Sequence, residues 1–180
     1  MSRGRLATGG QTGRDYNDGT WSPDGRWLAL SAADSSRLGK NLYIMRSDGS
    51  ARPELVLGLP GYQFPTDWTP DGRAIVLTRN RPGEPGEIWM VPAFGDHRPV
   101  PLVQSAYGAR GGRISPDGRW LAFEADETGR AEVYIQHFPG PGARVRVSQS
   151  GGRMPVWSRD GRRVFYWNRD QLLVARRGGG

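Results

Sequence analysis

Four aspartates are the residues of this chain whose type and spacing most suggest chemistry. They recur at intervals of 47, 46 and 43 residues, as Asp24, Asp71, Asp117 and Asp160. Carboxylates could serve as acid catalysts or as calcium ligands. Each one, however, lies in the same Ser/Thr-Pro-Asp-Gly-Arg sequence (Arg replaces Pro in the fourth copy) and precedes a glycine: Gly25, Gly72, Gly118 and Gly161. We therefore interpret these aspartates and glycines as turn residues that close hairpins.

The two histidines, His97 and His137, lie outside the repeated sequence. A metal enzyme would bring several histidines or carboxylates together, and two isolated histidines do not indicate such a site. The chain has no cysteine, and it contains no Gly-x-Ser-x-Gly elbow, P-loop or kinase signature. We therefore predict no catalytic residue, no metal and no cofactor, and we expect that the chain is not an enzyme.

The elements that position these residues form a repeat with a period in the forties. Short strands on either side of a turn, at that period, are typical of a β-propeller blade. We predict a single all-β domain over residues 1–180, with four WD-like blades at about 17–57, 64–103, 111–148 and 154–175. Each blade is expected to be a four-stranded antiparallel sheet.

The strands of each repeat can be read from its apolar runs. The second strands are continuously apolar, as in Trp27–Leu30 and Trp120–Phe123, which indicates strands covered on both faces. Third strands follow, as in Asn41–Met45 and Glu87–Val91. Shorter fourth strands, such as 53–57 and 99–103, begin with proline, which is typical of an outer edge.

The fourth repeat stops after its third strand. Residues 1–10 resemble an outer strand with its glycines, and could pair beside residues 172–175 to close the ring. Two alternatives stay open: a closed ring of four blades, or part of a larger ring completed by self-association or by further chain.

The net charge is +7, and 24 of the 25 basic residues are arginine. This composition allows a phosphate- or nucleic-acid-binding face, since arginine contacts phosphate bidentately. The arginines are scattered, however, and no basic run appears, so nucleic acid is not the expected partner. No apolar stretch approaches the roughly 20 residues that span a bilayer. The compartment is not predicted.

The repeated Trp-Ser-Pro-Asp-Gly-Arg turn, together with the third strand and the Ser47-Asp48-Gly49 that follows it, resembles the WD-like repeats of the TolB propeller family. The resemblance covers about residues 17–175. It implies a bacterial propeller. It is compatible with three roles of such repeats: protein binding in a cell-envelope system, sensing beside a protein kinase, or gating of a peptidase.

Function in such a scaffold is expected in the parts that do not repeat. The loops that lead into the innermost strands would open on one face, at the mouth of the central channel. Tyrosine and arginine are common in binding hot spots. The candidate binding residues are Tyr16, Tyr62, Gln63, Phe64, Tyr107, Arg110, Arg113 and Arg153. The sequence thus favours a scaffold that binds a protein or peptide. The alternatives are a regulatory propeller of a larger peptidase or protein kinase, and an arginine-driven binder of nucleic acid or phosphate.

Overall fold

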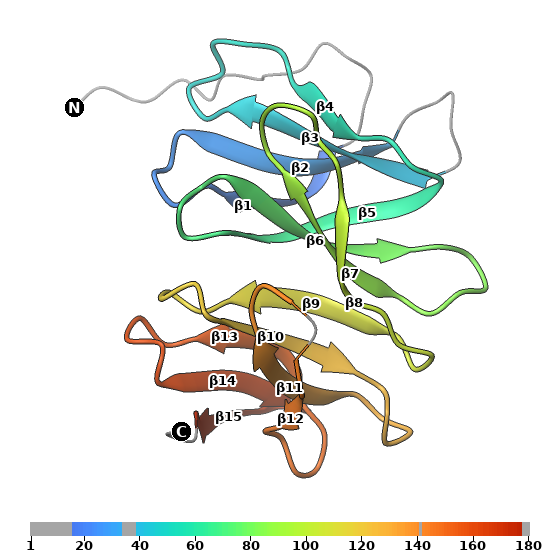
Figure 1. Ribbon diagram of the computed structural model, residues 1–180, viewed down its shortest axis with the longest axis vertical. Helices are drawn as coiled ribbons and strands as arrows, with labels where there is room; N and C mark the ends of the chain where they lie inside the picture. Colours follow the sequence, from blue (N-terminus) through green and yellow to red (C-terminus); the bar gives the residue numbers. More distant parts are fainter. Residues whose placement is uncertain (1–15, 34–38, 141, 178–180) are drawn as a thin grey trace.

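The computed structural model describes residues 16–33, 39–140 and 142–177. Every regular element within these ranges is a β-strand, and there are fifteen (Figure 1). They form four successive antiparallel units, one for each repeat. The all-β fold predicted from the repeated turns is therefore confirmed.

Within each unit the strands pair with their neighbours in chain order. The first unit consists of β1 (Tyr16–Trp21), β2 (Trp27–Ala33), β3 (Gly39–Arg46) and β4 (Glu54–Leu57). The second consists of β5 (Gly61–Trp68), β6 (Ala74–Asn80), β7 (Glu87–Pro92) and β8 (Val100–Val103). The third consists of β9 (Ala109–Ile114), β10 (Trp120–Ala125), β11 (Glu132–His137) and β12 (Val145–Arg146). The fourth consists of β13 (Arg153–Trp157), β14 (Arg163–Asn168) and β15 (Gln171–Arg176).

One parallel bridge joins the first two units. Gly39 of β3 pairs with Gly61 of β5, and the next residue on each strand continues the pairing. A β-carbon on Gly39 would lie 1.8 Å from the Gly61 carbonyl oxygen, so only glycine allows the two backbones to approach this closely.

The repeated turns have the predicted structure. In the first turn the Gly25 amide donates to the Ser22 carbonyl at 2.9 Å, and Gly25 has a φ of 69°. The Asp24 carboxylate accepts from the Ser22 hydroxyl at 2.6 Å and from the Arg26 amide at 3.0 Å. The other three turns repeat this network around Asp71, Asp117 and Asp160. Each of the four aspartates thus accepts hydrogen bonds within its own turn.

These hydrogen bonds make the turns sensitive to acid. The hydroxyl of Ser22, Thr69, Ser115 or Ser158 is the largest cause that lowers the pKa of the turn aspartate, and the Arg amide two residues on lowers it further. A carboxyl with a lowered folded-state pKa stabilises the fold above its unfolded pKa, and this contribution disappears as the pH falls through the folded value. We expect the free energy of unfolding to fall below about pH 4. The fall should be smaller in an Asp71→Asn/Asp117→Asn variant. Urea unfolding between pH 7 and pH 2 measures both. Equal pH dependence in the two proteins would contradict this role.

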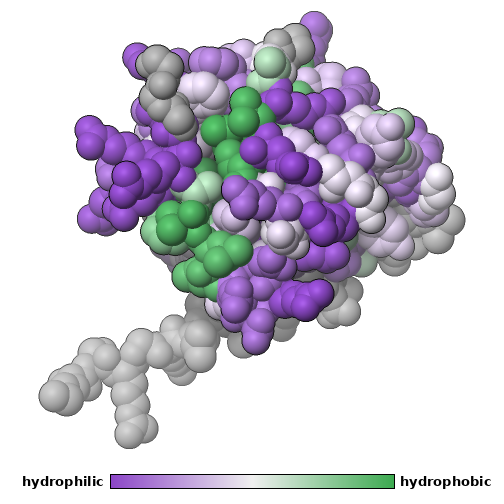
Figure 2. All heavy atoms as spheres, turned by 90° about the horizontal axis from the view of Figure 1, so that it is seen from below, coloured by the Kyte–Doolittle hydropathy of each residue, from purple (hydrophilic) through white to green (hydrophobic). Residues whose placement is uncertain are grey.

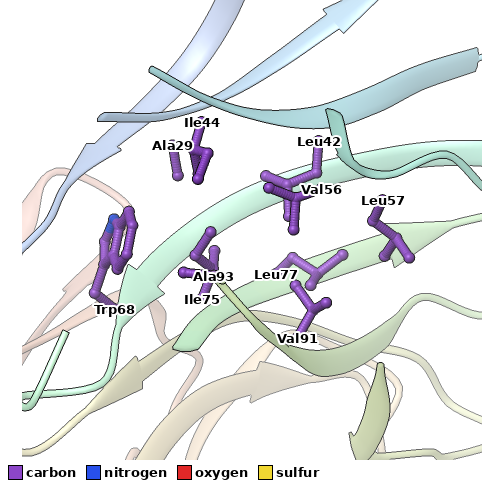
Figure 3. Close-up of a cluster of buried hydrophobic side chains, with 10 residues drawn as sticks. All are labelled: Ala29, Leu42, Ile44, Val56, Leu57, Trp68, Ile75, Leu77, Val91 and Ala93. Carbon is purple, nitrogen blue, oxygen red and sulfur yellow. The ribbon is translucent and has the colours of Figure 1, made fainter. Parts of the chain in front are cut away.

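The units stack face to face, and three apolar clusters lie where they meet. Between the first and second units, Leu42 and Ile44 of β3 pack against Trp68, Ile75 and Leu77 (Figure 3). The second cluster joins Val76 and Ile88 to the third unit, and the third cluster joins Ala122, Val133 and Ile135 to the fourth. This explains why β6 and β10 are apolar without alternation, because each lies between two neighbouring units and is covered on both faces.

Tryptophans at the end of the innermost strands link neighbouring units. The Trp68 indole nitrogen donates to the Thr20 carbonyl of the preceding unit at 3.0 Å. The Trp157 indole nitrogen donates in the same way to the Arg113 carbonyl, also at 3.0 Å. Each contact combines a large apolar surface with one hydrogen bond.

The four units follow one another along the molecule, with the first and the last at opposite ends of its longest axis (Figure 1). The predicted closing strand, residues 1–10, lies outside the described residues. The outer strands are short where the sequence placed them: β4, β8 and β12 contain four, four and two residues.

Candidate binding site on the loop face

The starts of the innermost strands β5, β9 and β13 lie at one end of their units, with the loops that precede them. We call this end the loop face. Neighbouring units meet there through backbone hydrogen bonds, as between the Ala109 amide and the Gly86 carbonyl at 2.7 Å, and between the Gly152 amide and the Ala131 carbonyl at 2.9 Å. The loops that precede β5, β9 and β13 therefore lie on one face of the described structure.

The aromatic candidates at the start of β5 form a small ridge. The rings of Tyr62 and Phe64 are stacked with centroids 6.0 Å apart, and the Lys40 ammonium lies 5.5 Å from the Phe64 centroid. Tyr62 is exposed. Gln63 points to the other side of the strand and is wholly buried, with its amide nitrogen donating to the Leu59 carbonyl at 2.9 Å. Gln63 therefore cannot contact a partner directly, which corrects its inclusion among the binding residues.

Two further tyrosines complete the aromatic candidates. Tyr107 lies in the loop before β9 with 60% of its surface exposed. Tyr16 is the first residue of β1 and pairs with Ala32, but its side chain lies outside the described part of the structure.

Arg110 is held by two carboxylates of its own unit. Its guanidinium donates to Glu124 at 3.0 Å and bidentately to Asp126 at 2.9 and 3.1 Å. The hydrogen bonds that Arg110 donates to Asp126 are the main cause that raises the pKa of Arg110, against the effect of burial. Because these carboxylates already neutralise the guanidinium, Arg110 is a weak candidate for binding an acidic group.

Arg113 has a structural role between units. Its guanidinium donates to the Thr66 carbonyl of β5, and its own carbonyl accepts from Trp157. The neighbouring Asp67 accepts from the Ile114 amide at 2.8 Å and from the Trp68 amide at 2.9 Å. Burial raises the pKa of Asp67, although these amides and the Arg113 cation oppose the rise. Arg113 is therefore occupied by contacts within the fold.

Arg153 is the candidate that the structure leaves available. It lines a pocket of about 610 Å³ on the loop face between the third and fourth units, which we call the loop-face pocket. Within the described residues, neither Arg153 nor Arg169 forms an ion pair or a side-chain hydrogen bond, and both are exposed. Arg130 also lines the pocket, but it pairs with Glu132 at 2.8 Å. Trp167 and Met154 supply exposed apolar surface.

Glu132 lies behind the loop-face pocket and binds two of its lining residues, Arg130 and Gly151. It is buried, and it accepts from the Ser148 hydroxyl and from the Gly151 amide at 3.0 Å, in addition to Arg130. Burial alone would raise the pKa of Glu132, but these three hydrogen bonds outweigh it and lower the pKa. The carboxylate thus fixes the glycine loop that forms one wall of the pocket.

The sequence did not single out a second basic pocket, of about 480 Å³, at the turn end of the fourth unit. It is lined by one acidic and four basic residues, namely Asp160, Arg162, Arg163, Arg176 and Arg177. Arg163 and Arg176 lie directly opposite each other on β14 and β15. These two arginines are not neighbours in sequence, and only the pairing register of β14 with β15 brings them together.

The histidines lie apart from both pockets. His97 is half-buried in the turn after β7, with Nδ1 2.9 Å from the Pro92 carbonyl oxygen. His137 is the exposed last residue of β11, and its ring lies 4.0 Å from that of Trp120. Across residues 16–33, 39–140 and 142–177, no group of three or more His, Asp or Glu is arranged to hold a metal ion. In the same ranges no helix is long and apolar enough to cross a membrane.

Comparisons with known proteins agree with this architecture. No protein-family model matches the sequence. A curated relative, the Tol-Pal system protein TolB of Anaeromyxobacter dehalogenans, is 37% identical over 93 residues, which cover 50% of this chain and 20% of that protein. A solved structure from Agrobacterium tumefaciens assigned to TolB superposes with a TM-score of 0.74 at 24% identity, over 88% of this chain and 60% of that one.

The same fold also occurs in part of a puromycin-hydrolyzing peptidase of Mycobacterium tuberculosis. Its TM-score is 0.66 at 16% identity, and the match covers 86% of this chain and 28% of the peptidase. At this identity the likeness concerns the fold alone.

The stacked antiparallel units and their repeated turns define a β-propeller built from WD-like repeats. The chain is similar to bacterial TolB propellers, and the part that matches the curated TolB relative spans about a fifth of that relative's length.

Proposed function

We propose that the chain is a non-catalytic scaffold that binds a protein partner, and that an acidic segment of the partner enters the loop-face pocket. The observation that carries the proposal is the pair Arg153 and Arg169, which line this pocket without a carboxylate partner among the described residues. Two such guanidinium groups can each bind a carboxylate bidentately.

The rest of the pocket fits a peptide rather than a small anion. Trp167 and Met154 offer apolar surface beside the arginines, and tryptophan and arginine are common in binding hot spots. Asn168 donates to the Ser150 carbonyl at 3.2 Å and so ties the hairpin of the fourth unit to the glycine loop. The net charge of +7 would also attract an acidic partner. The name of the curated relatives, which places them in the Tol-Pal system, further supports a protein partner.

A charge-reversal experiment tests the site. We expect the Arg153→Glu/Arg169→Glu variant to bind a fluorescent hexaglutamate peptide at least about tenfold more weakly than the unchanged protein. The two new carboxylates would repel the peptide, and a loss of about 1.4 kcal/mol in binding free energy is tenfold in affinity. Fluorescence anisotropy measures both affinities. The matched control is Arg26→Glu/Arg73→Glu, which changes the net charge equally at two exposed turn residues.

Equal losses in the two variants would show attraction by net charge alone and would contradict a site at the pocket. Tighter binding of single-stranded DNA, with a steep dependence on salt, would favour the nucleic-acid alternative. No binding of hexaglutamate by the unchanged protein would contradict the acidic-segment proposal.

A regulatory propeller of a larger peptidase is the second candidate function. The likeness to part of a puromycin-hydrolyzing peptidase favours it. In that case the residues that cleave a substrate would belong to another domain, so this chain alone should not hydrolyse peptides. Peptide cleavage by the purified chain would contradict both candidates.

A further inference from the structure

The fourth unit has an apolar face that no other described unit covers. We call the face of a unit that packs against the next unit its trailing face, and the opposite one its leading face. In the fourth unit Leu172 and Val174 of β15 lie on the trailing face and are 57% and 53% exposed. Figure 2 views the molecule from this end and shows an apolar band bordered by hydrophilic side chains.

The pairing register shows that these residues occupy positions that are buried elsewhere. Val174 pairs with Phe165, as Ile44 pairs with Ala29 in the first unit. Leu172 lies two residues before Val174 on β15. The residues at the same position in the other three units are Leu42 of β3, Ile88 of β7 and Val133 of β11, and all three are 0% exposed. The trailing face of the fourth unit therefore has the composition of a unit interface, but no unit within the described residues covers it.

The first unit has the complementary feature on its leading face. Trp21 corresponds to Trp68, but it is 57% exposed whereas Trp68 is 3% exposed. The Trp21 indole nitrogen forms no hydrogen bond with another described residue, whereas those of Trp68 and Trp157 donate to the preceding unit.

The repeated turns also show that the first unit lacks a neighbouring unit on its leading face among the described residues. A β-carbon on Gly72 would lie 3.8 Å from Pro23 of the preceding turn, and one on Gly161 would lie 3.5 Å from Pro116. At Gly25 no atom of the described residues, apart from Gly25 itself and its two chain neighbours, lies within 4 Å of that position. Each later turn thus touches the one before it, and the first turn has an open side.

We propose that a second copy of this chain covers these faces, with the leading face of each copy packed on the trailing face of the other. By the repeat, Trp21 of one copy packs beside Val174 of the other, and its indole nitrogen donates to the Val156 carbonyl, the position equivalent to Thr20 and Arg113. Val156 is 54% exposed in a single copy. Head-to-tail contacts of this kind close into a ring when the rotation permits.

Two arguments favour a second copy as the occupant. The same repeat generates both faces, so they match as the internal interfaces do. Two copies also supply eight units, within the range of about four to eight blades known for propellers. On the leading face, Leu30 and Tyr43 are already buried in a single copy, so Trp21 and the half-buried Leu28 are the side chains that the second copy would cover there.

Solution mass tests this proposal. Light scattering across a range of concentrations should give twice the 19.9 kDa chain mass. Leu172→Glu/Val174→Glu, on the trailing face, and Trp21→Glu, on the leading face, should each reduce this to one chain mass. The variants should keep their fold, checked by circular dichroism, because the replaced side chains are exposed in a single copy. The control is Leu55→Glu, an exposed leucine of β4, which should leave the mass unchanged.

Mixing the two variants distinguishes a head-to-tail contact from a symmetric one. The leading-face variant keeps an intact trailing face, and the trailing-face variant keeps an intact leading face. Their mixture should therefore recover one interface and form a mixed dimer, although neither variant dimerises alone. The structural proposal is wrong if the unchanged chain is a monomer at all concentrations, or if the mixture stays monomeric. Trp167 borders both this face and the loop-face pocket, so the variants avoid it.

Discussion

Replacing Trp68 with alanine is expected to lower the free energy of unfolding by about 3–5 kcal/mol, the usual range for truncating a buried aromatic side chain. Trp68 is 3% exposed and packs in the cluster between the first two units. Its loss opens a cavity and also leaves the Thr20 carbonyl without its indole donor. Urea unfolding, followed by circular dichroism, gives the difference.

Two comparison variants separate the contributions of Trp68. Trp68→Phe keeps one aromatic ring in the cluster but removes the hydrogen bond and the rest of the indole volume, so its loss of stability should be smaller than that of Trp68→Ala. Val100→Ala, at an exposed position of the same unit, should change stability by less than about 0.5 kcal/mol. A Trp68→Ala protein as stable as the Val100→Ala protein would contradict face-to-face packing of the first two units.

Replacing Glu132 with alanine is expected to cost about 2–4 kcal/mol, because each buried donor left unpaired costs about 1–3 kcal/mol. The Ser148 hydroxyl and the Gly151 amide would both lose their acceptor. Arg130 would lose its carboxylate as well, but it is 54% exposed and water can replace that contact. Thermal unfolding of the unchanged and variant proteins at pH 7 measures the loss.

The same substitution should also disturb the loop-face pocket, since Glu132 fixes the loop that contains Gly151. Glu132→Gln keeps the shape and one acceptor, and its cost should lie between those of the unchanged protein and of Glu132→Ala. Glu124→Gln is a useful comparison, because Glu124 holds Arg110 and the Met154 amide at 2.7 Å instead. If Glu132→Ala has the stability of the unchanged protein, the assigned hydrogen bonds are wrong.

The architecture was predictable from the sequence because its signals are local and repeated. A Pro-Asp-Gly turn constrains its own backbone, and four copies at one spacing indicate the stacking of equivalent units. The apolar runs that follow each turn were sufficient to place the second and third strands. The short β12 was harder, because outer strands have little burial to mark them.

The candidate site was only partly predictable, because contacts across strands decide which side chains are available. Gln63 and Tyr62 are neighbours in sequence, yet the strand alternation buries one and exposes the other. Arg110 is neutralised by two carboxylates on or just beyond the neighbouring strand. Arg153 has no such partner among the described residues. Whether a carboxylate lies beside each arginine depends on the pairing register of the strands, which a single sequence does not reveal.

Hydrogen exchange read by mass spectrometry, with and without hexaglutamate peptide, tests the proposed binding role most directly. The proposal predicts added protection at residues 150–154 and 167–169, which line the loop-face pocket, and none at the repeated turns on the opposite end. Protection confined to the arginines around residues 162–163 and 176–177 would place the acidic ligand in the other basic pocket. That result, or no added protection anywhere in the chain, would contradict a binding site on the loop face.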